Sequence, residues 1–306
     1  MKIGINGTGL VQQASIRAIR EDALNALAEG FSSYWIAEHP TGGFDAITVL
    51  SVIAEEVHDI ELGTAVVPTY PRHPMVLAGQ AMTAQGAIGN RFTLGVGLSH
   101  EVMMAQLGLS FEKPIRHLRE YLSVLMPLLE TGEVAFDGET ISCHAKIFRV
   151  REQRPDVVVA ALGPQALKVA GTRTDGTTLA WVGPKTIREH INPRISEAAA
   201  AAGRSNPRII ATLPVCVTDH ADQVRERISS SLSSYAELPS YRAMFEREGV
   251  TQPGDVAIAG HPIQVEEALS ELAEAGVTDF AASVFATNKD EYLHTRELLS
   301  RIGHLL

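Results

Sequence analysis

Short apolar runs alternate with longer amphipathic stretches along most of this chain. The runs are apolar on both faces and rich in valine, isoleucine and leucine, which is typical of buried parallel strands. We predict strands at Lys2–Asn6, Tyr34–Glu38, Ile60–Val67, Phe92–Gly97, Val157–Ala161, Thr177–Trp181, Ile209–Val217 and Asp279–Phe285.

Stretches with helical spacing separate these strands, among them Asp45–Val57, Pro114–Leu129, Pro184–Ala202 and Ile263–Ala275. Eight strand–helix units predict an α/β fold, a single (β/α)8 TIM barrel that forms one domain over residues 1–306. Such barrels have about 250 residues plus insertions. An open doubly wound sheet is the alternative, but eight similar units with strands near both ends favour closure.

Two stretches exceed the minimal barrel, Gly132–Pro155 and Ala221–Ala259. We expect both as insertions on the rim of the C-terminal face, where the active sites of barrels lie. The second carries four large side chains, Tyr235, Tyr241, Met244 and Phe245. It is either a lid over that face or a surface element packed on a neighbouring helix.

Composition and charge narrow the class of protein. The chain is 45% hydrophobic and 20% charged with a net charge of −10, which suits a globular enzyme and opposes nucleic acid as a partner. No 18-residue apolar window is present, so we expect no membrane span, and a strand starting at Lys2 leaves no room for a signal peptide. We therefore expect a cytoplasmic protein. Cys143 and Cys216 lie far apart, which predicts neither a disulfide framework nor a metal site.

A Gly-Pro turn follows the fifth predicted strand directly and is the strongest candidate for chemistry. A helix that begins there presents N–H groups without intrahelical partners, and its dipole favours a negative charge. We predict a phosphate-binding turn made by Ala161, Leu162, Gly163, Pro164 and Gln165. The alternative is a turn that serves only chain geometry, which is also the role we expect for the nearby Asp175.

The carboxyl ends of different barrel strands converge on one mouth. Asn6 ends the first predicted strand, and Glu38 and His39 end the second. The third, fourth and sixth end in Ala65–Pro74, Gly95–Glu101 and Trp181–Pro184. This mouth would combine carboxylate, imidazole and aromatic side chains.

Five ordered motifs, spread over nearly the whole chain, resemble the luciferase-like monooxygenase superfamily. Within it they are similar to the branch of coenzyme F420-dependent oxidoreductases that includes methylenetetrahydromethanopterin reductase. The motifs are Tyr34–His39, Leu62–Pro68 with Arg72–Pro74, Leu94–His100, Arg119–Leu122, and the stretch from Ala161–Pro164 to Asp175–Gly176.

The resemblance implies a homodimeric TIM barrel that holds a flat deazaflavin ring, or the isoalloxazine of FMN, in its mouth. The ring would lie against a bulge at Ala65 and Val66, which in relatives often contains a cis peptide bond. The phosphate end would lie on the Gly-Pro turn. The remaining cofactor residues implied are Gly97, Leu98 and Ser99, beside the phosphate or along the tail. Trp181, an aromatic residue at a strand end, is either a wall for the planar ring or an ordinary core residue.

His39 matches a position near the ring that has a catalytic or ring-stabilising role in F420-using relatives. Two departures concern the chemistry. Glu38 replaces an aspartate found in several F420 enzymes, and it either faces the ligand or pairs with an arginine across the barrel. His100 stands where sugar-phosphate-oxidising relatives carry a proton-donating glutamate, with Glu101 beside it. Arg72 and His73 either fix a turn or, for Arg72, meet an anion.

The predicted function is hydride transfer between C5 of F420 and a small organic substrate, reducing C=C or C=N or running in reverse. His39, His100 and Glu38 are the predicted catalytic residues, with either histidine moving the accompanying proton. Three alternatives remain. They are an FMN-dependent monooxygenase, a barrel enzyme without redox chemistry such as a sugar-phosphate isomerase or aldolase, and a non-catalytic relative that binds a flavin or deazaflavin.

Overall fold

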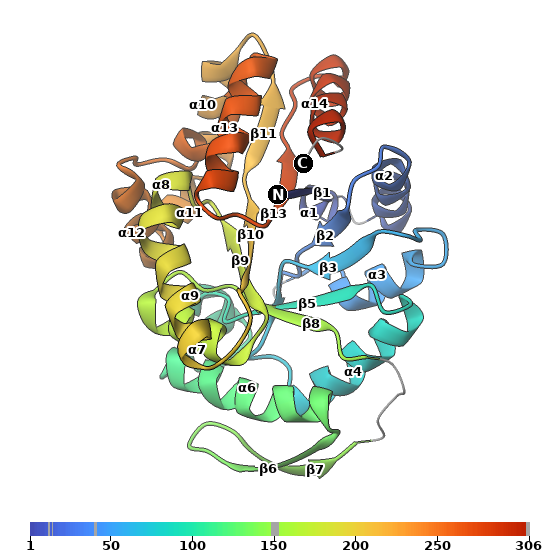
Figure 1. The fold of residues 1–306 in the computed structure, drawn as a ribbon, viewed down its shortest axis with the longest axis vertical. Helices are drawn as coiled ribbons and strands as arrows, with labels where there is room; N and C mark the ends of the chain where they lie inside the picture. Colours follow the sequence, from blue (N-terminus) through green and yellow to red (C-terminus); the bar gives the residue numbers. More distant parts are fainter. Residues whose placement is uncertain (12, 14, 40–41, 148–152, 304–306) are drawn as a thin grey trace.

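The predicted strands close into a parallel barrel surrounded by helices (Figure 1). A computed structural model describes residues 1–11, 13, 15–39, 42–147 and 153–303. The strand order runs from β1 through β2, β3, β5, β8, β9 and β10 to β13, and β13 pairs in parallel with β1. This closure confirms the (β/α)8 barrel and excludes the open sheet. None of the helices in the described ranges combines the length and apolarity needed to cross a bilayer.

The barrel strands lie close to their predicted bounds, and the first and fourth match them. They are β1 (Lys2–Asn6), β2 (Ser33–Ile36), β3 (Glu61–Thr64), β5 (Phe92–Gly97), β8 (Asp156–Val159), β9 (Gly176–Ala180), β10 (Arg208–Thr212) and β13 (Asp279–Val284). Two predicted strands are interrupted. The third resumes as β4 (Val67–Pro68), and the seventh resumes as β11 (Pro214–Val217), which pairs with β12 (Ile258–Gly260).

The helices begin where local sequence supplies a cap or a proline. Ser15 and Asp45 accept first-turn N–H groups, and proline opens several other helices, where its missing donor costs nothing. The helices are α1 (Thr8–Val11), α2 (Ile16–Ala28), α3 (Ala46–Ile53), α4 (Pro74–Ala87), α5 (Glu101–Gln106), α6 (Pro114–Glu130), α7 (Pro164–Arg173), α8 (Pro184–Thr186), the π-turn η1 (Ile187–Ile191), α9 (Asn192–Ala201), α10 (Ala221–Ser231), α11 (Ser233–Glu237), α12 (Pro239–Glu248), the 3-10 turn η2 (Pro253–Val256), α13 (Pro262–Glu274) and α14 (Lys289–Gly303).

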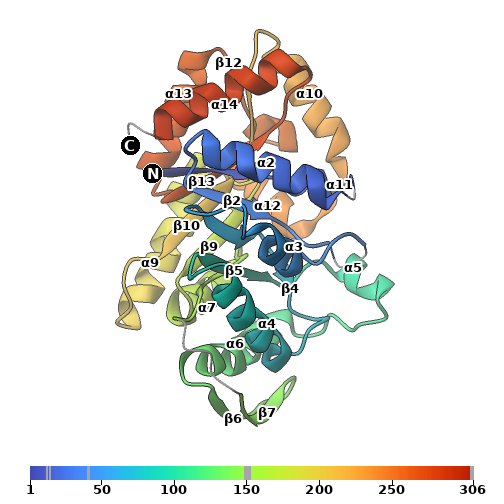
Figure 2. The same ribbon diagram turned by 90° about the vertical axis from the view of Figure 1, so that its right-hand side faces the viewer.

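The first insertion is an antiparallel hairpin of β6 (Glu133–Asp137) and β7 (Ser142–Lys146) on the outer side of α6 (Figures 1 and 2). Glu120 of α6 accepts hydrogen bonds from the backbone N–H groups of Thr140 and Ile141, which fixes the hairpin's turn. The prediction that this insertion lies on the rim of the C-terminal face is wrong, because the chain leaves the end of α6 and folds back along that helix. Residues 148–152 of this insertion lie outside the described residues.

Side chains fill the barrel interior, so the barrel is not a pore. Trp35, Val158, Ile210 and Ala281 from four strands pack together there and are fully buried. Gly63 makes room for the indole, because a Cβ at that position would lie 2.1 Å from a carbon of the Trp35 ring. The aromatic bulk on β2 therefore requires the absence of a side chain on β3.

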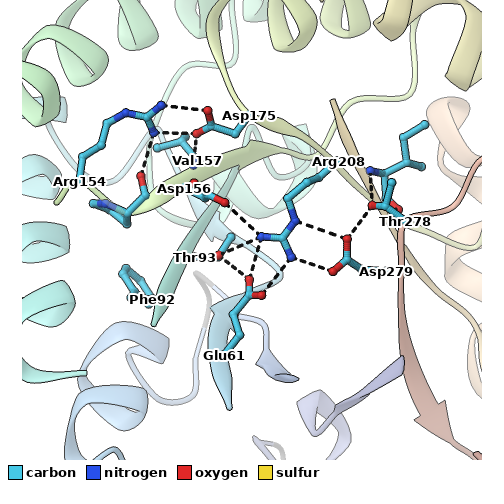
Figure 3. Close-up of polar contacts among 12 residues, drawn as sticks. Glu61, Phe92, Thr93, Arg154, Asp156, Val157, Asp175, Arg208, Thr278 and Asp279 are labelled. Carbon is cyan, nitrogen blue, oxygen red and sulfur yellow. Dashed lines mark hydrogen bonds and ion pairs between the residues drawn. The ribbon is translucent and has the colours of Figure 1, made fainter. Parts of the chain in front are cut away.

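At the end of the barrel opposite the mouth, one arginine forms ion pairs with residues at the amino ends of three other strands (Figure 3). The Arg208 guanidinium, on β10, lies 2.9 Å from Glu61 on β3, 2.8 Å from Asp279 on β13 and 3.3 Å from Asp156 on β8. Burial opposes its charged form, but the Glu61 and Asp279 carboxylates outweigh that effect and raise the pKa of Arg208. The arginine thus neutralises carboxylates from three other strands.

Replacing Arg208 should destabilise the barrel strongly. In Arg208→Met the largely buried Glu61 and Asp279 lose their counter-charge, and we expect the free energy of unfolding to fall by about 3–5 kcal/mol. Urea titration followed by circular dichroism measures this loss. The matched control is Arg188→Met, which removes an exposed pair with Glu271 at 3.6 Å and should cost less than about 1 kcal/mol. Equal losses in the two variants would contradict a stabilising role for Arg208.

Candidate functional site

The barrel strands run in one direction, so their carboxyl ends form a single mouth. In Figure 2 the strands point away from the side that carries the two termini and toward the side where α5 and α11 project. The predicted site residues occupy the loops that leave these strands. Their positions around the mouth follow from hydrogen bonds between neighbouring strand ends.

The break in the third strand is a cis peptide bond between Ala65 and Val66, as the resemblance implied. The Ala65 N–H donates to the Ile36 carbonyl at 2.9 Å, and the Glu38 N–H donates to the Val66 carbonyl at 3.0 Å. These bonds join the bulge to the end of the second strand. His39 follows directly, so the bulge and the predicted catalytic pair share one corner of the mouth.

Gly97 permits a close approach between three strand ends. A Cβ at this position would lie 2.7 Å from Cγ2 of Val66 and 3.3 Å from the Cβ of Ala160. The bulge, the end of β5 and the start of the Gly-Pro turn therefore lie side by side. Ser99, two residues on, has a φ of 62°, an uncommon left-handed conformation that turns the chain toward α5.

The amino end of α7 is open. Gly163 is its N-cap residue and supplies no side-chain cap, while a Cβ at Gly163 would meet no atom within 4 Å. Pro164 and Gln165 are exposed. Ala161 is buried and Leu162 half-buried beneath them. The turn therefore leaves both space and N–H donors for an anion.

A second Gly-Pro helix start in the same barrel provides a direct comparison. α8 begins after Gly183, and there the Glu248 carboxylate from α12 accepts the N–H groups of Lys185 at 3.1 Å and Thr186 at 2.7 Å. A Cβ at Gly183 would collide with that carboxylate. The protein's own anion occupies this helix start, whereas none of the described side chains caps α7.

Glu38 pairs with an arginine, one of the two placements the sequence left open. The Arg72 guanidinium donates to both carboxylate oxygens, at 2.6 and 3.0 Å, and also to Asp45 at 2.5 Å. Burial opposes the charge on Arg72, but its hydrogen bonds to the Glu38 and Asp45 carboxylates and the attraction of their charges outweigh burial and raise the pKa of the arginine. The carboxylate of Glu38 is thereby directed into this ion pair, next to the backbone that carries His39.

The two predicted catalytic histidines differ in their surroundings. His39 is half-buried. His100 precedes α5 without capping it, and its ring centroid lies 5.8 Å from that of Tyr241. Burial lowers the pKa of His100 below its ordinary value. The neutral imidazole therefore predominates at neutral pH.

The second insertion lies over the mouth. Its Tyr235 ring is 5.7 Å from the ring of Trp181, at the end of β9, and 5.4 Å from that of Tyr241. With the contact between Tyr241 and His100, these rings bridge the ends of the sixth and fourth strands. Trp181 has a φ of 62°, a genuine outlier for a bulky residue and typical of a functional constraint. The buried side chains of Met244 and Phe245 anchor the insertion.

The chain matches the luciferase-like monooxygenase family over residues 3–283, nearly its whole length. It belongs to this family. The family expected from the sequence motifs is thereby confirmed.

Curated relatives match along most of their length. A 5,10-methylenetetrahydromethanopterin reductase from Archaeoglobus fulgidus is 25% identical, with 83% of this chain and 85% of the relative covered. An F420-dependent glucose-6-phosphate dehydrogenase from Kineococcus radiotolerans is 26% identical over 93% of this chain and 87% of its own. The solved structure of a coenzyme F420-dependent tetrahydromethanopterin reductase from Methanopyrus kandleri superposes with a TM-score of 0.83 at 23% identity, covering 100% and 99% of the two chains.

Two residues of the family-like motifs are structural. The His73 side chain accepts the N–H of Met75 at 3.2 Å and fixes the start of α4. Asp175 accepts hydrogen bonds from Arg154 at 2.7 Å and from the Val157 N–H at 2.8 Å, at the end of the barrel opposite the mouth (Figure 3). Asp175 therefore shapes the turn before β9, as expected.

His117 of α6 is a buried residue near the mouth that the sequence analysis did not single out. Its Nε2 lies 3.1 Å from the hydroxyl of Thr69, and its ring stacks on Tyr70 with centroids 3.9 Å apart. Burial lowers its pKa to about 4, although the Glu120 carboxylate acts in the opposite direction. The signal in the sequence was its place one helical turn before Tyr121 on the buried face of a predicted helix.

The buried His117 should make stability depend on acid pH. The unfolded chain takes up its proton near pH 6.5 and the folded chain near pH 4, so stability is lost as pH falls through this window. We expect the protonation of His117 to lower the free energy of unfolding by about 3 kcal/mol between pH 7 and pH 4. Urea titrations of wild type and His117→Phe should differ by that amount in their pH dependence.

An exposed histidine supplies the control for that measurement. His58 is largely exposed beside Asp59, so His58→Phe should keep the pH dependence of the wild type. The same pH dependence in wild type and His117→Phe would show that His117 does not titrate abnormally.

Proposed function

We propose that this protein is a coenzyme F420-dependent oxidoreductase acting on a small organic substrate. The observation that carries the proposal is the uncapped amino end of α7 at Gly163, beside the mouth formed by Val66 and Gly97. The relatives named as F420-dependent enzymes support this choice of cofactor. When bound at this mouth, reduced F420 would supply hydride chemistry at C5 of its deazaflavin ring, suited to the reduction of a C=C or C=N bond.

The residues at the mouth fit a ligand with one flat end and one anionic end. Ala65, Val66 and Gly97 offer small or apolar surfaces against which a planar ring packs. Ala161, Leu162, Gly163, Pro164 and Gln165 form the turn proposed to hold the phosphate, with Leu98 and Ser99 beside it. Because Gly163 carries no side chain, an anion reaches the first-turn N–H groups directly.

The chain's own contribution to the reaction is placement and proton transfer. His39 or His100 moves the proton that accompanies the hydride. The lowered pKa of His100 keeps its imidazole neutral, which is the form that can accept this proton when the reaction runs in reverse. Glu38, fixed by Arg72, positions the adjacent backbone of His39. Trp181, Tyr235 and Tyr241 exclude water from the covered mouth and provide aromatic surface for the substrate.

Equilibrium binding tests this function. We expect purified protein to bind F420 with micromolar or tighter affinity and FMN more weakly, as followed by cofactor fluorescence. Gly163→Arg should weaken F420 binding at least about tenfold, because the new side chain fills the space at the start of α7. The matched control is Gly79→Arg on α4, another position where a Cβ meets no atom within 4 Å.

Each other outcome points to one of the alternatives. Preference for FMN, with fast reaction of the reduced complex with oxygen, would indicate a monooxygenase. Tight F420 binding without reoxidation by any substrate class would indicate a non-catalytic carrier. Failure to bind either ring would overturn the proposal and favour a barrel enzyme without redox chemistry.

We also propose a homodimer, as the resemblance implies. Val52 on α3 and Val76 on α4 are 61% and 63% exposed although apolar, and they lie on neighbouring helices, which supports a contact there. Light scattering should give twice the chain mass of 33.0 kDa. Val52→Glu should shift the mass toward one chain, whereas Leu293→Glu on α14 should not. A monomeric wild type would contradict the proposal.

A further inference from the structure

His190 lies beneath the Gly-Pro turn and is bonded to it. Its side chain is 2% exposed, and its Nε2 lies 2.8 Å from the carbonyl oxygen of Leu162. A carbonyl only accepts, so Nε2 carries the proton. Burial lowers the pKa of His190, with Arg247 and Arg194 acting in the same direction against the hydrogen bond to Leu162, so the ring is neutral. Its buried Nδ1 has no hydrogen-bond partner within the described ranges.

A proline accounts for the position of His190. Pro193 lies within a continuous run of helical turns and has no N–H to donate, and its ring opposes an α-helical turn through the Glu189 carbonyl. The chain responds with the π-turn η1, in which the Asn192 N–H donates to the Ile187 carbonyl. The Arg194 side chain donates to the carbonyl of His190 at 3.0 Å. His190 lies in this widened turn, and its imidazole reaches the Leu162 carbonyl.

The bond to Leu162 also orients the next N–H group. In a trans peptide unit the C=O and N–H point in opposite directions. Because the Leu162 carbonyl points at His190, the Gly163 N–H points away from it. This N–H has no hydrogen-bond partner in the described part of the chain. It joins the first-turn N–H groups of α7, which lack intrahelical partners.

We propose that His190 is a positioning residue that holds the Leu162–Gly163 peptide so that the Gly163 N–H faces the phosphate of the bound ligand. The proposal rests on the proposed function for the identity of the ligand, though not for its anionic group. His190 touches neither substrate nor cofactor. It sets the direction of one donor through the carbonyl on the other side of the same peptide.

Inorganic phosphate provides a test that does not depend on F420. In 15N-glycine-labelled protein, phosphate should shift the amide resonance of Gly163 and saturate. His190→Leu, which removes the donor, should weaken the affinity for phosphate at least about tenfold. His190→Gln, whose amide N–H still donates, should bind phosphate within about threefold of wild type. His294→Leu, an exposed histidine on α14, is the matched control and should bind as wild type does.

A second comparison separates positioning from general damage. Affinity is measured for F420 and for its deazaflavin chromophore without the phosphate tail. His190→Leu should bind F420 about tenfold more weakly than wild type and should bind the phosphate-free chromophore with unchanged affinity. Equal losses for both ligands, or unchanged phosphate and F420 affinities, would overturn the positioning role.

The two proposals fail differently. Suppose that phosphate shifts the Gly163 amide resonance and that His190→Leu weakens phosphate binding, but that wild type does not bind F420. The cofactor assignment then fails and the positioning role stands. If phosphate leaves the Gly163 resonance of wild type unchanged, the positioning role fails, and F420 binding alone decides the proposed function.

Discussion

The barrel depends on the neutralisation of charges at its closed end. Arg208 on β10 sits among Glu61, Asp156 and Asp279, three carboxylates from three other strands. A buried carboxylate without a counter-charge is costly, so the guanidinium stabilises the strands that bring these carboxylates together. The polar groups at this end are satisfied by one another. The opposite end is then free to leave groups without internal partners, which is the condition for binding a ligand.

Two helices at the mouth, α7 and α8, begin with the same Gly-Pro sequence but differ in what lies at their amino ends. At Gly183 the Glu248 carboxylate of the second insertion occupies the amino end of α8, which fastens the insertion to the barrel. At Gly163 the amino end of α7 has no such cap. The same local sequence, Gly-Pro after a buried strand, thus serves packing at one position and leaves an open helix start at the other. The difference comes from a residue more than sixty positions away.

Indirect contacts hold the residues proposed for chemistry. Arg72 takes up the charge of Glu38 next to His39, and the tyrosines of the insertion connect His100 to Trp181. His190 fixes the turn at Leu162 from the π-turn that Pro193 imposes. In each case a second layer of side chains determines how the mouth is presented. Such supporting layers decide the precision of a site built at strand ends.

Local patterns in the sequence determined the barrel and the location of its mouth. Apolar runs predicted the strands, because a strand that is buried on both faces needs apolar side chains on both. The Gly-Pro pair after Val157–Ala161 located the open helix start. Tertiary structure alone decided that Glu38 meets Arg72, that the hairpin of β6 and β7 folds along α6, and that His117 and His190 are buried beside the mouth. These outcomes depend on contacts between residues far apart in the chain, and a one-dimensional pattern carries no information about which side chain will occupy the space next to another.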